Sequence, residues 1–348
     1  MFEVTLLLLV IFLSMTKVSR WSLIIAMALG LLFSFSRADR VHMLSQFSGV
    51  ILSIIGLDVG ISLFARNTSW RNIGRSISAT FASLITLTAV SWTLFWVRPS
   101  MTGFVLACAS TSVVTGPALI RLQEAQASPL YTLVLRIAAT DDFFAYLIFS
   151  IYVWRAQKIS LGAVSVIFVF LFSMIVALRF SSSSIKMRSF RAVVAGVGVA
   201  VGLVFAQPLL SSVAAGLLIK SESLLCAILE KLARALAPAY FFLTFSNVDL
   251  NAASNVGSLP AAVGMILFLL LVSRISATLI VNAQSRLLFA VATYPRGVVA
   301  LAIANSSYES HLFSASLYTT FLAAVLISNA IVVAIFQPLY TYSTRATR

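Results

Sequence analysis

The chain has 348 residues, of which 60% are hydrophobic and only 10% are charged, and its mean hydropathy is +1.03. Soluble globular proteins carry about 25% charged residues. The composition therefore excludes an ordinary soluble domain and predicts a protein that lives in a lipid bilayer, with membrane lipids as its surroundings. The net charge of +14 does not indicate a nucleic-acid-binding protein, because the basic residues lie between apolar runs and form no basic stripe.

Apolar segments follow one another along the whole chain. A helix that crosses a membrane needs about 20 largely apolar residues, or fewer where it is broken or shielded by neighbours. The predicted spans are 3–16, 21–36, 44–65, 72–96, 101–122, 129–155, 160–179, 190–206, 208–220, 222–247, 258–283, 286–307 and 313–338. We therefore expect an all-α polytopic membrane protein of about 13 transmembrane helices, with a single transport domain over 1–348 and no soluble domain.

With 13 spans, successive loops alternate between the two sides of the membrane, and most of the 24 lysines and arginines then fall on one side. Basic residues accumulate in cytoplasmic loops. The distribution predicts a multi-pass protein of the cell membrane with its N-terminus outside and its C-terminus in the cytoplasm. The two cysteines, Cys108 and Cys226, lie in apolar stretches, so we expect neither a disulfide framework nor a metal-ligand cluster, and no cofactor.

Two of the predicted spans are interrupted by Gly, Pro and polar residues. The fifth contains the run 110–117, Ser-Thr-Ser-Val-Val-Thr-Gly-Pro, and the twelfth contains 294–299, Tyr-Pro-Arg-Gly-Val-Val. They lie seven spans apart, so the halves of the chain, approximately 1–155 and 190–338, are predicted to be inverted repeats. Paired interrupted helices in inverted halves indicate a transporter site near the middle of the bilayer.

Three acidic residues, Asp58, Asp141 and Asp142, fall clearly inside predicted spans. An ionisable group there is costly and indicates a functional site. The neighbours Asp141 and Asp142 cannot both stay charged in an apolar setting without a cation or a basic partner, so the pair can exchange protons for a small cation. The alternative for the pair is a salt bridge that only fixes helix packing. For Asp58, near the cytoplasmic end of the third span, a structural pairing is expected.

Arg274 is the expected countercharge for the aspartates, because its predicted helix is otherwise apolar. Arginine keeps its proton in proteins, so the aspartates must carry any transported proton. Extension of Arg274 to the membrane surface is the alternative. Arg296, at the second interruption, is expected to hold the interrupted backbone. Thr111, Ser112 and Thr115 offer oxygens to a cation, unless they bond to their own helix.

The order of these motifs resembles the monovalent cation:proton antiporter superfamily, which includes the sodium/proton exchangers. The segment 110–114 is similar to the family's first unwound segment, and Thr140-Asp141-Asp142 to its paired-acid motif. The segment 237–242 resembles the Pro-x-Phe-Phe stretch that precedes the basic-residue helix. Arg274 matches the family's buried basic residue, and the segment 295–301 resembles the Pro-Arg-Gly motif of the second unwound segment.

The resemblance implies a fold with a panel domain and a six-helix core in which two broken helices cross. It also implies alternating access, a homodimer, and a role in pH homeostasis. Asp142 is then the ligand of the monovalent cation, and Asp141 the partner of Arg274. The candidate ion- and proton-binding residues are Asp141, Asp142, Thr111, Ser112, Thr115 and Thr140, and the charge-balancing residues are Arg274 and Arg296. Paired aspartates are typical of the electrogenic branch, whereas Arg274 and the Pro-Arg-Gly motif are typical of the electroneutral branch.

The leading hypothesis is a secondary antiporter that exchanges sodium, or else potassium or lithium, for protons. A sodium-coupled symporter of small solutes is a second hypothesis, although adjacent carboxylates do not suit an anion site. A membrane sensor or assembly subunit without transport activity is a third. No enzyme activity is expected, because two adjacent acids on one helix cannot face each other across the cleft of an intramembrane aspartyl protease.

Overall fold

The computed structural model describes residues 10, 22–36, 42–63, 70–95, 102–111, 129–156, 185–204, 208–219, 224–248, 259–279 and 286–346. The elements of these residues are α2 (Ser22–Ser36), α3 (His42–Leu63), α4 (Trp70–Phe95), α5 (Thr102–Ala109), α8 (Pro129–Ala156), α10 (Ile185–Val204), α11 (Pro208–Gly216), α12 (Leu224–Ser246), α14 (Leu259–Thr278), α15 (Arg286–Ala292), α16 (Val298–Glu309) and α17 (Ala315–Ala346). The all-α prediction is confirmed for the described part of the chain. The seventh predicted span, 160–179, lies outside the described residues. Of the first predicted span, 3–16, only Val10 is described.

Several of these helices match a bilayer in length and composition. Among the described residues, three segments are long and apolar enough to cross a membrane, namely Gly74–Thr93, Leu259–Thr278 and Ala315–Thr341. Shorter apolar helical segments accompany them at Ser22–Ser34, Phe47–Ser62 and Val193–Leu203. Two helices, α8 and α11, begin at a proline, which suits the first turn because no hydrogen-bond donor is needed there.

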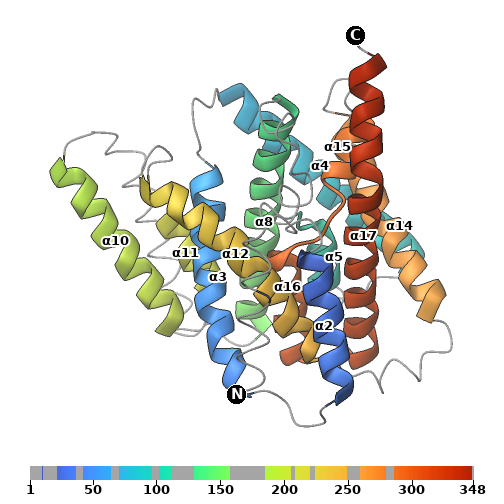
Figure 1. The fold of residues 1–348 in the computed structure, drawn as a ribbon, viewed down its shortest axis with the longest axis horizontal. Coiled ribbons are helices and arrows are strands. Elements are labelled where there is room, and N and C mark those ends of the chain that lie inside the picture. The colour runs from blue at the N-terminus through green and yellow to red at the C-terminus, as the bar shows by residue number, and fades with distance from the viewer. Residues whose placement is uncertain are drawn as a thin grey trace.

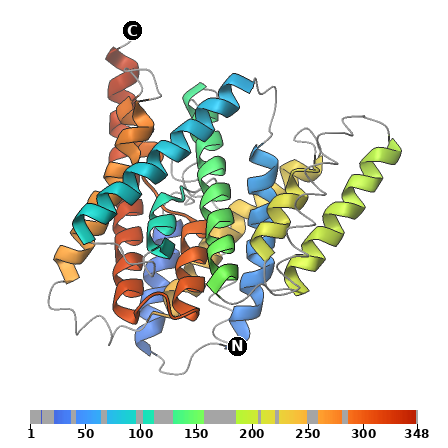
Figure 2. The same ribbon diagram turned by 180° about the vertical axis from the view of Figure 1, so that it is seen from behind.

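The described helices pack as two groups (Figure 1). In the first, which we call the panel group, α3 lies against α11 and α12, α2 lies along α12, and α10 stands at the edge beside α11. In the second, the core group, α4, α5, α8, α14, α15, α16 and α17 contact one another. Contacts between the groups run mainly through α3 with α8 and α12 with α16. The view from behind shows α8 beside α5, with α4 passing across them (Figure 2).

Glycines allow α3 and α11 to pack closely within the panel group. A Cβ atom built on Gly60 would lie 2.1 Å from the carbonyl oxygen of Val213, and one on Gly216 would lie 2.3 Å from that of Leu57. Real side chains do not tolerate such distances, so only glycine permits this approach. Small residues at helix contacts are a common packing device in membranes, where backbone proximity rather than the hydrophobic effect stabilises helix pairs.

The structure interrupts both predicted spans that carry Gly and Pro. The helix α5 ends at Ala109, and Ser110 and Thr111 follow it outside any helix. The twelfth predicted span is divided into α15 and α16, with residues 293–297 between them. Pro295 contributes to this break because it has no backbone N–H to donate to a preceding turn. Broken helices leave unpaired carbonyl and amide groups inside the protein, and these groups need partners.

Candidate functional site

Asp141 and Asp142 lie in the middle of α8 and are 1% and 2% exposed. Successive residues of an α-helix project about 100° apart around its axis, so the two carboxylates meet different neighbours. Asp141 faces α4 and α14, which supply its partners Thr80 and Arg274. Asp142 contacts the residue that follows α5. The adjacent acids therefore occupy two distinct environments.

Three side chains donate to the carboxylate of Asp141. The Thr80 hydroxyl is 2.6 Å from Oδ1, and the Thr111 hydroxyl is 2.7 Å from Oδ2. The guanidinium Nη1 of Arg274 lies 2.6 Å from the same Oδ2 and forms a buried ion pair. A carboxylate can accept about four hydrogen bonds. Asp141 is thus largely occupied by protein donors from three separate segments.

Asp142 is held by Ser110. The Ser110 hydroxyl donates to Oδ1 of Asp142 at 2.5 Å, and its backbone N–H donates to the carbonyl oxygen of Leu106 in the last turn of α5. The side chain that contacts Asp142 therefore belongs to the unwound end of a broken helix. This arrangement places a carboxylate beside a hydroxyl oxygen, and small hard cations prefer oxygen ligands.

Arg274 is completely buried on α14 and reaches three different partners. Besides its bond to Asp141, Nη2 donates to the carbonyl oxygen of Ala109 at 2.8 Å, and Nε donates to Oγ of Ser273 at 3.0 Å. The first of these bonds supplies a donor to the C-terminal end of α5, where helix carbonyls lack partners. Arg274 therefore does not extend to the membrane surface, and it joins the first break to the ion pair.

Loss of Arg274 is expected to destabilise the fold strongly. Arg274→Gln leaves the charge of Asp141 buried without its cation, a change that typically costs about 3–5 kcal/mol. Thermal unfolding of the purified protein in detergent measures the loss, and Arg75→Gln, at an exposed position of α4, is the matched control. Adding Asp141→Asn to Arg274→Gln is expected to recover part of the stability. Strictly additive losses in the double variant would show that the two side chains do not stabilise each other.

Arg296 is also completely buried, and it binds the second break. Its Nη1 lies 3.1 Å from the carbonyl oxygens of both Thr293 and Tyr294, and its Nη2 lies 3.2 Å from Oγ of Ser273. The amide of Asn329 on α17 donates to the backbone oxygen of Arg296 at 3.2 Å. The guanidinium thus supplies positive charge and donors to carbonyl groups freed at the end of α15, where a helix dipole favours a cation.

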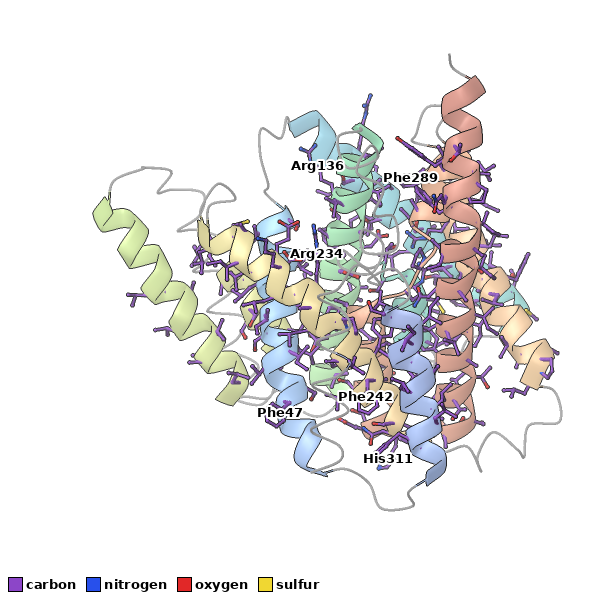
Figure 3. The ribbon with its side chains drawn as sticks, viewed as in Figure 1. Phe47, Arg136, Arg234, Phe242, Phe289 and His311 are labelled. Carbon is purple, nitrogen blue, oxygen red and sulfur yellow. The ribbon has the colours of Figure 1, made fainter. Side chains whose placement is uncertain are left out.

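The structure brings together only some of the residues predicted to bind the ion or balance its charge. Thr111, Asp141, Asp142 and Arg274 lie in direct contact or one residue apart, and Arg296 joins them through Ser273. Thr140 differs, because its hydroxyl donates to the carbonyl oxygen of Arg136 in its own helix at 2.7 Å. Ser112 and Thr115 lie outside the described residues. Arg136 itself lies near one end of α8, away from the middle of the helix (Figure 3).

Four residues that contact the site were not predicted from the sequence as site residues. They are Thr80, Ser83, Ser110 and Ser273. Ser110 belongs to the interrupted segment, and its position beside Thr111 could have suggested a role. The others are single hydroxyl residues in apolar helices, where a bond to the residue's own helix is the common arrangement. Only the register of α4 and α14 against α8 shows that they face the site.

Asp58 lies apart from this site, at the contact between α3 and the α12 helix. It is 5% exposed, and its charged neighbours are Glu230 and Arg234, which form an ion pair with each other on α12. Arg234 points toward α3 and α8 (Figure 3). This placement inside the panel group provides a buried aspartate for comparison with Asp142.

Comparisons with known proteins identify the fold. No family model matches the sequence, and no curated protein matches it. Among solved structures, the chain is similar to the sodium proton antiporter MjNhaP1 from Methanocaldococcus jannaschii at pH 8. The match has a TM-score of 0.67 and 16% sequence identity, and it covers 96% of this chain and 99% of the other. The chain therefore shares the fold of this sodium proton antiporter.

Proposed function

We propose that the protein is a secondary antiporter that exchanges a monovalent cation for protons by alternating access, with Asp142 as the carrier of both. The observation that supports this most directly is the buried Asp142 at the open end of α5, beside an Asp141 that is already paired with Arg274. A solved structure with the same fold is that of a sodium proton antiporter, which makes sodium the first cation to test.

Competition at one carboxylate is sufficient for exchange in this proposal. Asp142 binds either a proton or a cation, and each neutralises its charge. A site that is loaded in either way can move through the apolar interior, whereas a bare carboxylate there is strongly unfavourable. Transport of one ion in one direction then requires return of the other. Thr111 and Ser110 stand beside the carboxylates and are the described side chains best placed to complete the cation's shell.

The direct test is an exchange assay in everted membrane vesicles with an imposed proton gradient. Addition of sodium is expected to dissipate the gradient, and parallel additions of lithium and potassium determine the selectivity. A response that requires an added organic solute would instead support the symporter hypothesis. Absence of any response to the three cations, from mildly acidic to alkaline pH, would contradict the antiporter proposal and leave the non-transporting subunit as the better hypothesis.

The charges of the site predict that exchange does not respond to membrane potential. Asp141 is paired with Arg274, and arginine does not release its proton in proteins. Only Asp142 then changes its ligand, so one cation is exchanged for one proton. In proteoliposomes, the rate is expected to be the same with and without an imposed potential. Arg274→Lys, which introduces a group able to lose a proton when buried, is expected to make the rate sensitive to potential.

We further propose that the protein is a homodimer of the cell membrane with an outside N-terminus and a cytoplasmic C-terminus. The bias of basic residues supports the orientation. Labelling of a single cysteine introduced at His311 is expected from outside the cell only, because His311 lies in the exposed turn after α16. Labelling from the cytoplasm alone would reverse the topology. Chemical crosslinking in native membranes tests the dimer.

A further inference from the structure

Ser273 is the point at which the two buried arginines meet. Its Oγ accepts from Nε of Arg274 at 3.0 Å and from Nη2 of Arg296 at 3.2 Å, and it donates to the carbonyl oxygen of Leu270 at 2.7 Å. A serine hydroxyl has two acceptor positions and one donor. All three are used, and the residue is completely buried.

The position of this hydroxyl is fixed from both sides. The bond to Leu270 lies within α14, and the backbone oxygen of Ser273 accepts from the Ser83 hydroxyl of α4 at 2.8 Å. Ser83 lies one helical turn from Thr80, which donates to Asp141. The helix α4 therefore contacts both the Asp141 carboxylate and the backbone of Ser273, through two short hydroxyl side chains one turn apart.

Arg296 has no acidic residue as a direct bonding partner among the described residues, although it carries a full charge in the interior. Its bonds are to the break at 293–297 and to Ser273, and its Nε is buried without a partner in the described part of the chain. The route from Arg296 to Asp141 thus passes through the Ser273 hydroxyl and the guanidinium of Arg274.

We propose that Ser273 is the positioning residue through which Arg296 and the second helix break act on the ion-binding carboxylates. The same hydroxyl keeps two like charges at set places, so that Arg274 alone contacts Asp141 while Arg296 stays on the carbonyl groups of its own segment. Since Arg274 also binds Ala109 at the end of α5, one continuous chain of hydrogen bonds joins the two breaks. The effect of Ser273 on ion exchange rests on the proposed function, whereas its effect on the coupling between Arg296 and Asp141 does not.

Removal of the hydroxyl is expected to weaken cation binding more than turnover. In Ser273→Ala, two guanidinium donors lose their common acceptor, so Arg274 and the carboxylate that it binds are no longer held in the position that the second break sets. Loss of an acceptor by buried donors corresponds to roughly a tenfold effect. We therefore expect about a tenfold higher KM for the exchanged cation with a maximal rate close to that of the parent protein.

Two companion variants separate positioning from general damage. Ser273→Thr keeps the hydroxyl and is expected to restore the KM. Ser276→Ala removes a hydroxyl one turn along α14 that donates to the Ser273 backbone oxygen and not to either arginine, so it is expected to leave the KM unchanged. An unchanged KM in Ser273→Ala, or an equal rise in Ser276→Ala, would overturn the proposal.

A second measurement does not depend on transport. Thermal unfolding in detergent compares Arg296→Gln, Asp141→Asn and their combination, first with Ser273 present and then with Ser273→Ala. The effects of the two substitutions are expected to be non-additive when the serine is present and additive when it is absent. Arg296→Lys replaces Arg296→Gln if the latter does not fold. Equal coupling between Arg296 and Asp141 with and without the Ser273 hydroxyl would refute the proposal, even if the protein shows no cation exchange. Loss of this coupling in Ser273→Ala would support the proposal whether or not the protein exchanges cations.

Discussion

Asp142→Asn is expected to abolish cation/proton exchange while the protein still folds and reaches the membrane. Asparagine has nearly the same shape and can still accept the Ser110 hydrogen bond at Oδ1, so the packing of α8 against α5 is retained. It has no charge, however, and it neither takes up a proton nor balances a bound cation. The measurement is the sodium-induced collapse of an imposed proton gradient in vesicles, at matched protein levels.

Asp58→Asn is the matched control for this substitution. Asp58 is also a buried aspartate, but it lies on α3 beside charges of α12 and contacts none of the site residues described above. Exchange is expected to persist in Asp58→Asn. A normal sodium response in Asp142→Asn would show that the carrier group lies elsewhere and would contradict the proposed mechanism.

Locking α12 to α16 is expected to stop exchange completely and reversibly. The amide of Asn305 on α16 lies 3.4 Å from the hydroxyls of Thr244 and Tyr240 on α12, so these side chains meet where the core group contacts the panel group. Alternating access by movement of one group against the other requires this contact to separate. In a variant with Cys108 and Cys226 replaced, a cysteine pair at Thr244 and Asn305 bridged by a short thiol crosslinker should be inactive until the bridge is reduced.

The control for the crosslink joins two helices of the same group. A Cβ atom built on Gly103 of α5 lies 3.4 Å from Cβ of Ser307 on α16, close to the spacing found in disulfides. A bridge between cysteines at these positions is expected to leave exchange largely intact, because both helices belong to the core group. Full exchange with α12 bridged to α16 would exclude a relative movement of the two groups at this contact.

The helices and both interruptions could be predicted because their causes are local in the sequence. Apolar runs of membrane length predict spans wherever they occur, and Pro295 and Gly297 interrupt a helix through their own backbone chemistry. The pairing of Arg274 with an aspartate was also predictable as a hypothesis. Very few buried groups in an apolar chain can balance a buried cation, and the structure places Nη1 of Arg274 on Asp141.

The choice between the two adjacent acids could not be made from composition or spacing. Asp141 meets Thr80, Thr111 and Arg274, whereas Asp142 meets Ser110, because the rotation of α8 decides which carboxylate faces which neighbour. The resemblance implies a place for Thr140 among the ion-binding residues, whereas its hydroxyl donates to the carbonyl oxygen of Arg136 in its own helix. Serine and threonine carry no signal that distinguishes these two arrangements.

The sequence by itself therefore determined that the chain is a membrane protein, where its helices run and break, and which charged residues are buried with them. Hydropathy and the cost of burying charge act on each segment separately, so they are readable without a fold. Only the tertiary structure decided that Ser273 joins Arg274 to Arg296 and that Ser110 holds Asp142. These contacts depend on the relative depth and rotation of α4, α5, α8 and α14, which are set by packing between helices far apart in the chain.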